Sequence, residues 1–271
     1  MDRGISIHIG VNHPEGMYEP LSTSEDTAWK LAELAFQAGY RAIHLLRGDE
    51  ATRESVGALL FDAGRTLRCG ETLFVTFSGH GSPVRNAGGN APAGYDERWC
   101  LHDADLVDDE LAKFWRKLPR GARALVVADC CFAAGTLRKG HLPMAWDGAE
   151  PYPEWSEDAS RGVKQFHPAA SVTAPRKDDG IGASVLLLAA TSKQQKAQEG
   201  LYAGHLLDVW AGGNFRGSFS ELHEAVRQRV LREKQDQEPQ LLMLGAPDDR
   251  FPQQMAFHLD RPVTRGGGGP Y

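Results

Sequence analysis

Two short motifs in this sequence carry side chains that could act as a nucleophile and its base. His80 stands between two glycines after the apolar run 71–77, and Cys130 and Cys131 follow the apolar run 123–128. Only the thiolate is a good nucleophile, and an imidazole within reach can take the thiol proton and later donate it to a leaving amine. The two motifs therefore indicate cysteine-dependent cleavage of an acyl bond.

Both motifs are expected at the ends of buried parallel strands, where ligands bind in open α/β sheets. Strand and helix patterns alternate along the chain, which favours an α/β fold: a mainly parallel sheet of about six strands with helices on both faces. The glycine-rich stretch 81–94 is predicted to be a loop. We expect strands at 4–12, 40–46, 72–77, from 122, at 185–190 and 241–245, and helices at 24–38, from 52 to near 69, and at 107–118, 201–210 and 219–234.

Composition narrows the possible functions of the chain. The 271 residues have a net charge of −6, so no basic excess is present to bind nucleic acid. No run approaches the roughly 18 apolar residues of a membrane span, and the N-terminus enters a strand without a signal-peptide core. A cytoplasmic protein that binds neither nucleic acid nor membrane is the expectation.

The four cysteines do not have the spacing of a zinc site. Taken alone, a loop histidine or a core cysteine is more often structural than catalytic. The combination is different, because His80 and Cys131 both follow strand ends and lie about fifty residues apart, the separation typical of caspase-type enzymes. Small residues after Cys131 and glycines beside His80 leave room for a substrate backbone and for N–H groups that face an oxyanion.

The chain resembles the caspase-like cysteine peptidases, and most closely the metacaspases and bacterial orthocaspases. The resemblance is carried by Ser-Gly-His-Gly at 78–81 and by Asp-Cys-Cys-Phe-Ala-Ala-Gly at 129–135. It implies a caspase-like fold with Cys131 as nucleophile, His80 as base and the backbone N–H groups of Cys131 and Gly81 around the oxyanion. Further segments agree in order along the chain, at 95–97, 107–110, 189–197 and 238–240.

The nucleophile motif departs from the family pattern Asp-Ser-Cys-His-Ser-Gly. Cys130 takes the place of the serine, and Phe132 and Ala133 replace His-Ser. These changes leave the nucleophile position intact. Because successive strand side chains alternate between faces, we expect Cys130 to pack into the sheet.

The resemblance also implies acids that hold a basic substrate side chain in the S1 pocket, just before the cut. Asp129 and Asp26 match the two S1 acids, and Ser78 and Thr23 match further pocket positions. Leu21 lies near the position where caspases have an arginine, which disfavours an aspartate pocket. Asp26 could also serve as a helix-capping acid.

Calcium is a weaker expectation, and no cofactor is predicted to be required. Asp96, Asp108 and Asp109 match acids that hold calcium in some metacaspases. The fourth ligand would fall near Arg138 or Lys139, which are basic. Asp108 and Asp109 could equally be first-turn helix acids.

The stretch 138–184 is interpreted as a linker between two halves of one domain. The expected domain spans 1–263, with a large-subunit-like half at 1–137, a small-subunit-like half at 185–263 and a disordered tail at 264–271. An enzyme that cuts after basic residues could process this linker itself, or an upstream protease could do so; an ordinary solvated insertion is the alternative. The candidate processing sites are Arg138, Arg161, Lys164, Arg176 and Lys177.

The sequence therefore predicts a monomeric, bacterial cysteine endopeptidase that cuts protein or peptide substrates after Arg, then Lys. Two alternatives remain open. One is an Asp-specific caspase-like protease, which the acidic pocket disfavours. The other is a catalytically silent caspase-like interaction protein, which the intact His80 and Cys131 disfavour.

Overall fold

The structure is a computed structural model that describes residues 4–16, 18–40, 42–85, 95–135, 180–192 and 195–259. Six strands form the main sheet in the order β2-β1-β3-β7-β8-β9. All neighbours pair in parallel except β8 and β9, which are antiparallel. The predicted α/β fold is confirmed. The strands are β1 (Gly4–Gly10), β2 (Ala42–Arg47), β3 (Thr72–Ser78), β7 (Arg123–Asp129), β8 (Ser184–Ala189) and β9 (Gln240–Gly245).

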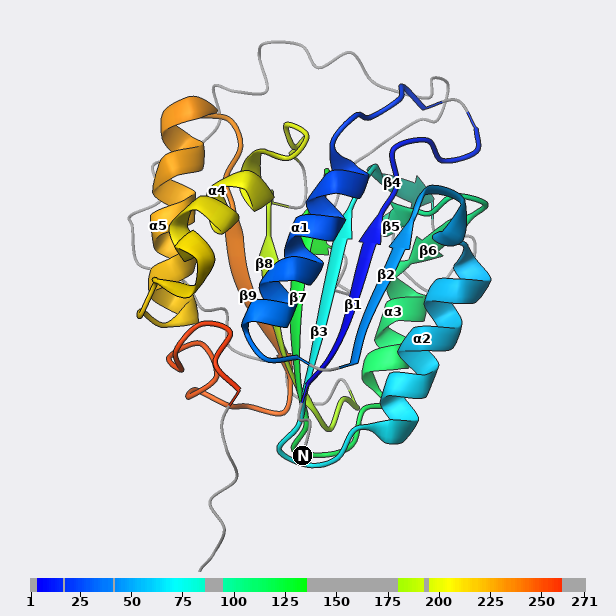
Figure 1. The fold of residues 1–271 in the computed structure, drawn as a ribbon. Coiled ribbons are helices and arrows are strands. Elements are labelled where there is room, and N and C mark those ends of the chain that lie inside the picture. The colour runs from blue at the N-terminus through cyan, green and yellow to red at the C-terminus, as the bar shows by residue number, and fades with distance from the viewer. Residues whose placement is uncertain are drawn as a thin grey trace, which may run out of the picture.

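Helices cover both faces of this sheet, and each face has its own apolar core. One core packs α1 (Ser24–Gln37), α4 (Leu201–Trp210) and α5 (Phe219–Glu233) against the sheet, as Figure 1 shows. The other core packs α2 (Arg53–Thr66) and α3 (Asp108–Trp115). Short 3-10 turns lie at Gly48–Glu50, Ala133–Gly135 and Ala211–Gly213. Because β7 pairs with β8, the segments before and after the long 136–179 stretch share one sheet.

The helices begin within one residue of the predicted starts, and a side chain caps the first turn of α2 and of α5. The Thr52 hydroxyl accepts a hydrogen bond from the Ser55 N–H at 3.1 Å at the start of α2. Ser218 and Glu221 form a reciprocal capping box at the start of α5. α4 has the bounds that its sequence pattern predicts.

The loop predicted at 81–94 is wrong in its first part. Gly81–Arg85 is a strand, β4, which pairs with β5 (Tyr95–Cys100), and β5 pairs with β6 (Asp105–Val107) in a small antiparallel sheet. This sheet lies beyond the carboxyl end of β3, as Figure 1 shows. The buried Trp99 of β5 stacks on Phe77 of β3, with ring centroids 4.8 Å apart, and so fixes the small sheet to the main one. Glycine and proline concealed β4, because they are weak strand formers.

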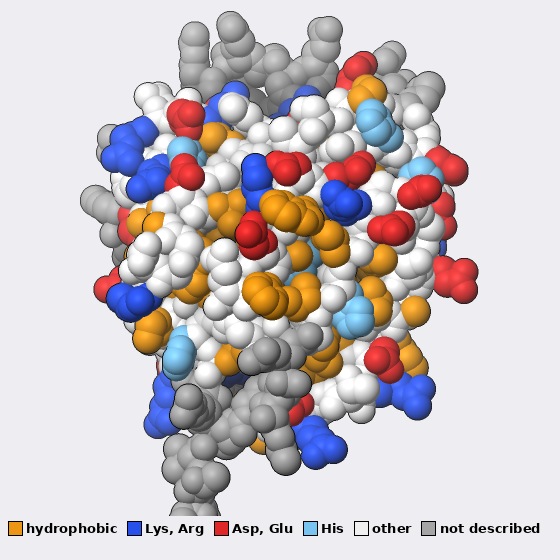
Figure 2. Space-filling view, viewed as in Figure 1, with side chains coloured by type: hydrophobic (Ala, Val, Ile, Leu, Met, Phe, Trp, Pro, Cys, Tyr) orange, Lys and Arg blue, Asp and Glu red, His pale blue; other side chains and the backbone are white. Residues whose placement is uncertain are grey.

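Figure 2 shows acidic and basic side chains interspersed on the face that carries α1 and α4. Within the described ranges, no helix has the length and apolar character needed to cross a membrane.

Candidate active site

The structure places the two predicted motifs at the same level of the same sheet edge. β3 and β7 are parallel neighbours, and Ser78 pairs with Asp129. His80 and Cys131 each follow two residues later, so both leave the sheet side by side. The backbone of Gly81 lies against the nucleophile turn: a Cβ added at Gly81 would come within 2.2 Å of the Cys131 carbonyl oxygen. Only glycine fits here.

The His80 ring is oriented by the loop that precedes α1. Its Nε2–H donates to the Glu19 carbonyl at 2.7 Å, and in this tautomer Nδ1 is free to accept a proton. The Tyr18 ring stacks on the imidazole, with centroids 5.2 Å apart and an interplanar angle of 29°. Burial and a hydrogen bond to the Cys100 side chain raise the pKa of Tyr18, so the ring stays a neutral phenol. His80 is thus held on one edge and on one face.

Cys131 is partly buried, and its thiol lies against the segment after β8. The Ala197 N–H donates to Cys131 Sγ at 3.2 Å. Burial raises the pKa of the Cys131 thiol, although the Ala197 N–H and the Lys196 charge act in the opposite direction. The resting group is therefore a thiol, and reaction at neutral pH needs a base to take its proton.

The chain turns sharply after Cys131, and Phe132 takes a left-handed conformation with φ 57°. A bulky residue in this region costs about 1–3 kcal/mol and needs support from its surroundings. Here the Phe132 N–H donates to the Gln195 carbonyl at 3.0 Å, and the Ala133 N–H donates to the Thr191 hydroxyl at 3.1 Å. The Thr191 hydroxyl in turn donates to the Cys130 carbonyl at 3.3 Å. Thr191 and Gln195 therefore hold the turn that presents Cys131.

Cys130 is buried at 2% exposure in the core beneath α2 and α3, as predicted from strand alternation. The backbone N–H of Gly81, a predicted oxyanion donor, points away from the neighbouring strand β5. The Cys100 N–H donates to the His80 carbonyl at 3.0 Å, which makes His80 and Cys100 a hydrogen-bonded pair of the β4–β5 ladder. The next pair, Gly81 and Trp99, is then a non-hydrogen-bonded pair, so the Gly81 N–H faces away from β5.

Buried polar atoms that have no hydrogen-bond partner among the described residues occur at the ends of β3 and β7 and at the start of α1. Asp129 is 4% exposed, and its Oδ2 accepts the Ala203 N–H at 3.3 Å. Asp129 Oδ1 and the hydroxyls of Ser78 and Ser24 are buried with no hydrogen-bond partner among the described residues. Burial raises the pKa of the Asp129 carboxyl to about 7; the Ala203 N–H opposes this shift, and the charge of Glu199 adds to it. Native structures seldom leave such groups unpaired, so a polar ligand group is expected here.

Beside Asp129 lies a cavity of about 250 Å³ between α1 and α4. Asp26 and Thr23, both predicted site residues, line it together with Glu199, whereas the predicted site residues Asp129 and Ser78 are not among its lining residues. The Asp26 carboxylate is 58% exposed and forms an ion pair with Lys30 at 2.6 Å. Glu199 Oε1 accepts the Ser22 N–H at 2.7 Å and the Thr23 hydroxyl at 2.9 Å. These hydrogen bonds outweigh the effect of partial burial and lower the pKa of Glu199, so it is a carboxylate.

Sequence reasoning missed Glu199, Tyr18 and the Glu19 carbonyl. Glu199 meets Thr23 across 176 residues of chain, and a backbone carbonyl carries no side-chain signature at all. The glycine at position 200 could have indicated a turn directly after Glu199. Its left-handed φ of 67° reverses the chain there, and α4 begins at the next residue.

The predicted calcium ligands are only partly described. Asp108 and Asp109 begin α3, and the Asp109 N–H donates to Asp108 Oδ1 at 2.7 Å, as expected of first-turn acids. The Asp96 side chain lies outside the described residues, and the described part of the chain contains no group of three or more His, Cys, Asp or Glu that could hold a metal. Calcium binding stays a prediction. The candidate processing sites, Arg138, Arg161, Lys164, Arg176 and Lys177, also lie outside the described residues.

Comparison with known sequences agrees with this geometry. A family model described as "Caspase domain" matches residues 3–246 of the chain. Metacaspase-1 of Arabidopsis thaliana is 33% identical over 91 residues, which cover 32% of this chain and 25% of that protein. Metacaspase-4 of the same plant is 26% identical over 174 residues, covering 59% and 42%. The chain thus spans less than half the length of these curated relatives.

Solved structures give the same result. Protein GSU0716 from Geobacter sulfurreducens has a TM-score of 0.73 and 26% identity, covering 96% of this chain and all of that one. Caspase-1 from Spodoptera frugiperda has a TM-score of 0.54 at 12% identity, covering 94% and 92%, which shows a shared fold. The chain therefore belongs to the caspase-domain family of cysteine peptidases, and metacaspases are among its relatives.

Proposed function

We propose that this protein is a cysteine endopeptidase that cuts after Arg, and less readily after Lys, with Cys131 and His80 as its catalytic pair. The observation that carries the proposal is the register of β3 and β7, which brings both residues to one sheet edge. The segment that contacts Cys131 Sγ through the Ala197 N–H continues to Glu199, which lines a cavity together with Asp26. Two sets of contacts support the proposal: the Glu19 carbonyl orients His80, and the Thr191 hydroxyl and the Gln195 carbonyl hold the turn after Cys131.

In the proposed reaction, His80 moves protons to and from Cys131, the leaving amine and water. His80 Nδ1 takes the proton of Cys131 Sγ, and the thiolate attacks the carbonyl carbon before the cut. The Gly81 N–H, with the Cys131 N–H, donates to the oxyanion that forms. The imidazolium then protonates the leaving amine as the C–N bond breaks, which leaves a thioester. His80 next takes a proton from a water molecule as its oxygen attacks the thioester carbonyl. The C–S bond then breaks, the carboxylic acid product leaves, and the imidazolium returns its proton to the Cys131 thiolate.

Charge selects the side chain before the cut. Two carboxylates, Asp26 and Glu199, line the cavity, and a third, Asp129, accepts the N–H of Ala203, which precedes the lining residue Gly204 on α4. A guanidinium can bind two carboxylates through paired hydrogen bonds, which an ammonium cannot match. An aspartate side chain would meet like charges here, which disfavours the Asp-specific alternative. A silent interaction protein would have no use for a histidine and a thiol held in register.

A peptide panel tests this proposal. Fluorogenic peptides that end in Arg, Lys or Asp are incubated with the purified protein, with and without calcium, and with Cys131→Ala as control. We expect kcat/KM to fall in the order Arg, Lys, Asp, with the Asp peptide at least about a hundredfold below Arg because of unpaired like charges. Fragments of the chain in these incubations that Cys131→Ala does not produce would support self-processing after basic linker residues. Faster cleavage of the Asp peptide, or no cleavage of any peptide by intact or linker-cut protein, refutes the proposal.

A further inference from the structure

The acidic cavity already contains a basic side chain of its own. Lys30 lies four residues after Asp26 on α1, and its ammonium is 2.6 Å from Asp26 Oδ2. Both residues line the 250 Å³ cavity, together with Glu199. The two side chains are about half exposed, so the ion pair is accessible to competition from solvent or from an incoming ligand. The Lys30 ammonium has the charge and donors of the lysine or arginine tip that the proposed function places here.

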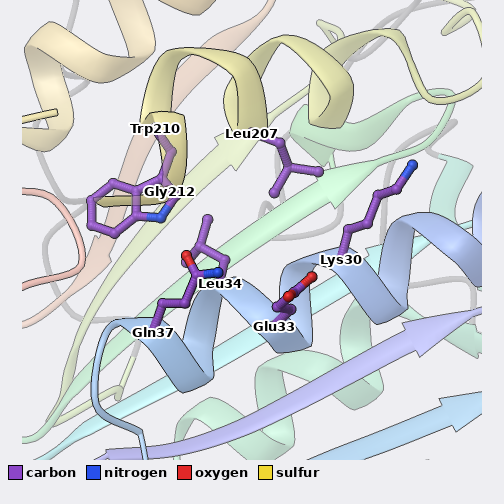
Figure 3. A pocket seen from close by; sticks show the side chains of 7 residues that line it. All are labelled: Lys30, Glu33, Leu34, Gln37, Leu207, Trp210 and Gly212. Atoms are coloured by element: carbon purple, nitrogen blue, oxygen red, sulfur yellow. The ribbon is translucent and has the colours of Figure 1, made fainter. Parts of the chain in front are cut away.

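A second hollow adjoins the first and offers Lys30 another partner. It has a volume of about 160 Å³ and is lined by Lys30 and Glu33 of α1 and by Leu207 and Trp210 of α4, as Figure 3 shows. Lys30 and Leu207 line both cavities. Glu33 lies three residues after Lys30, a spacing at which helical side chains of opposite charge can pair. In Figure 3 the Lys30 ammonium points away from Glu33, in keeping with its bond to Asp26.

We propose that Lys30 is a specificity-determining residue that competes with the basic side chain of the substrate for Asp26 and moves to Glu33 when the substrate enters. This inference rests on the proposed function. The competition weakens the binding of every basic side chain. It weakens lysine most, because a single ammonium must displace an identical group, whereas a guanidinium can bind two carboxylates at once. Lys30 therefore sharpens the preference for Arg over Lys.

Kinetics of Lys30→Gln test the competition. We expect KM for the Arg peptide to fall about twofold to fivefold, the range of an exposed ion pair, with kcat unaltered. The Lys peptide should gain more than the Arg peptide, so that the Arg-to-Lys ratio of kcat/KM narrows, and the gain should shrink in high salt. Lys234→Gln is the matched control, because Lys234 forms an exposed ion pair with Asp236 at the end of α5. An unaltered Arg-to-Lys ratio in Lys30→Gln overturns the proposal.

The role of Glu33 is tested in the same assay. Glu33→Gln should raise KM in the wild-type background, because Lys30 loses its second partner, and should have no effect on KM in Lys30→Gln. An equal effect in both backgrounds would contradict the movement of Lys30.

Binding separates this inference from the proposed function. Agmatine, a small guanidinium compound, is titrated into Cys131→Ala and into Cys131→Ala with Lys30→Gln, with calorimetry as the readout. Tighter binding to the double variant supports the competition even if no peptide is ever cleaved, in which case only the proposed peptidase activity fails. Equal affinity overturns the competition even if Arg peptides are cleaved well.

Discussion

Cys131→Ala is expected to lower kcat/KM for an Arg peptide by about 10⁴-fold or more, the usual result of removing a nucleophile that acts with its base as a unit. The fold should persist, because Cys131 lies on a turn that is held by hydrogen bonds to the Gln195 carbonyl and the Thr191 hydroxyl. Thermal unfolding of the variant should therefore occur close to the wild-type temperature. The measurement is kcat/KM together with the unfolding midpoint.

The neighbouring cysteine supplies the control. Cys130 is buried in the core beneath α2 and α3, so Cys130→Ala should retain activity within about tenfold and lose about 1 kcal/mol of stability, as small cavities do. The two variants should therefore have opposite effects. Cys131→Ala should lose activity and keep its stability, and Cys130→Ala should keep most of its activity and lose stability. Retained activity in Cys131→Ala would contradict the assignment of the nucleophile.

Asp129→Asn is expected to change both substrate affinity and the pH dependence of folding. The proposed function assigns the Asp129 carboxylate to the guanidinium of the substrate, and removing one partner of a buried charge pair costs about 2–5 kcal/mol. The variant should therefore lose about a hundredfold or more in kcat/KM for the Arg peptide. In the free protein, burial raises the pKa of Asp129 to about 7. The kcat/KM of the wild type for the Arg peptide should therefore increase as the pH is raised through about 7, because only the ionised carboxylate attracts the guanidinium. Asp129→Asn should lack this increase.

The effect on stability follows from the same raised pKa. Between pH 4 and pH 7 the folded protein holds a proton on Asp129 that the unfolded chain has released, so the contribution of this group to stability falls as the pH rises through that window. A tenfold difference in proton affinity between the folded and the unfolded chain corresponds to about 1.4 kcal/mol of stability. Asp129→Asn should therefore be more stable than wild type at pH 8, while near pH 4 the difference should be small.

Denaturant unfolding at pH 5, 6, 7 and 8 measures this dependence. Asp208→Asn is the matched control, since Asp208 is an exposed acid of α4 and its replacement should leave both stability and kcat/KM near the wild-type values. If the free energy of unfolding depends on pH in the same way in the wild type and in Asp129→Asn, Asp129 is not a buried, protonated group in the folded protein.

The parts of this site that the sequence predicts are those with a local pattern. Apolar runs that end in His80 and Cys131 marked two parallel strands, and strand alternation predicted the burial of Cys130. The hydroxyl of Thr52 marked the start of α2. In each case a few consecutive residues determine the outcome.

The parts that sequence reasoning missed depend on contacts between distant segments. β4 is a strand only because β5 pairs with it, and glycine and proline hide its pattern. Tyr18 reaches His80 across 62 residues of sequence (80 − 18), and Glu199 reaches Thr23 through a bond that no composition predicts. The left-handed Phe132 is tolerated because Gln195 and Thr191 hold its turn. These contacts exist only after the sheet has formed.

Covalent labelling tests whether Cys131 is the nucleophile and whether the site prefers a basic side chain before the cut. The protein is treated with peptidyl chloromethyl ketones that end in Arg or in Asp, and the adduct is located by peptide mapping and mass spectrometry. We expect one adduct, on Cys131 Sγ. It should form faster with the Arg compound than with the Asp compound, and His80→Ala should abolish it. The exposed Cys69 is an internal control for indiscriminate alkylation. An adduct on Cys130 or Cys69 in place of Cys131, or faster reaction with the Asp compound, would contradict the account.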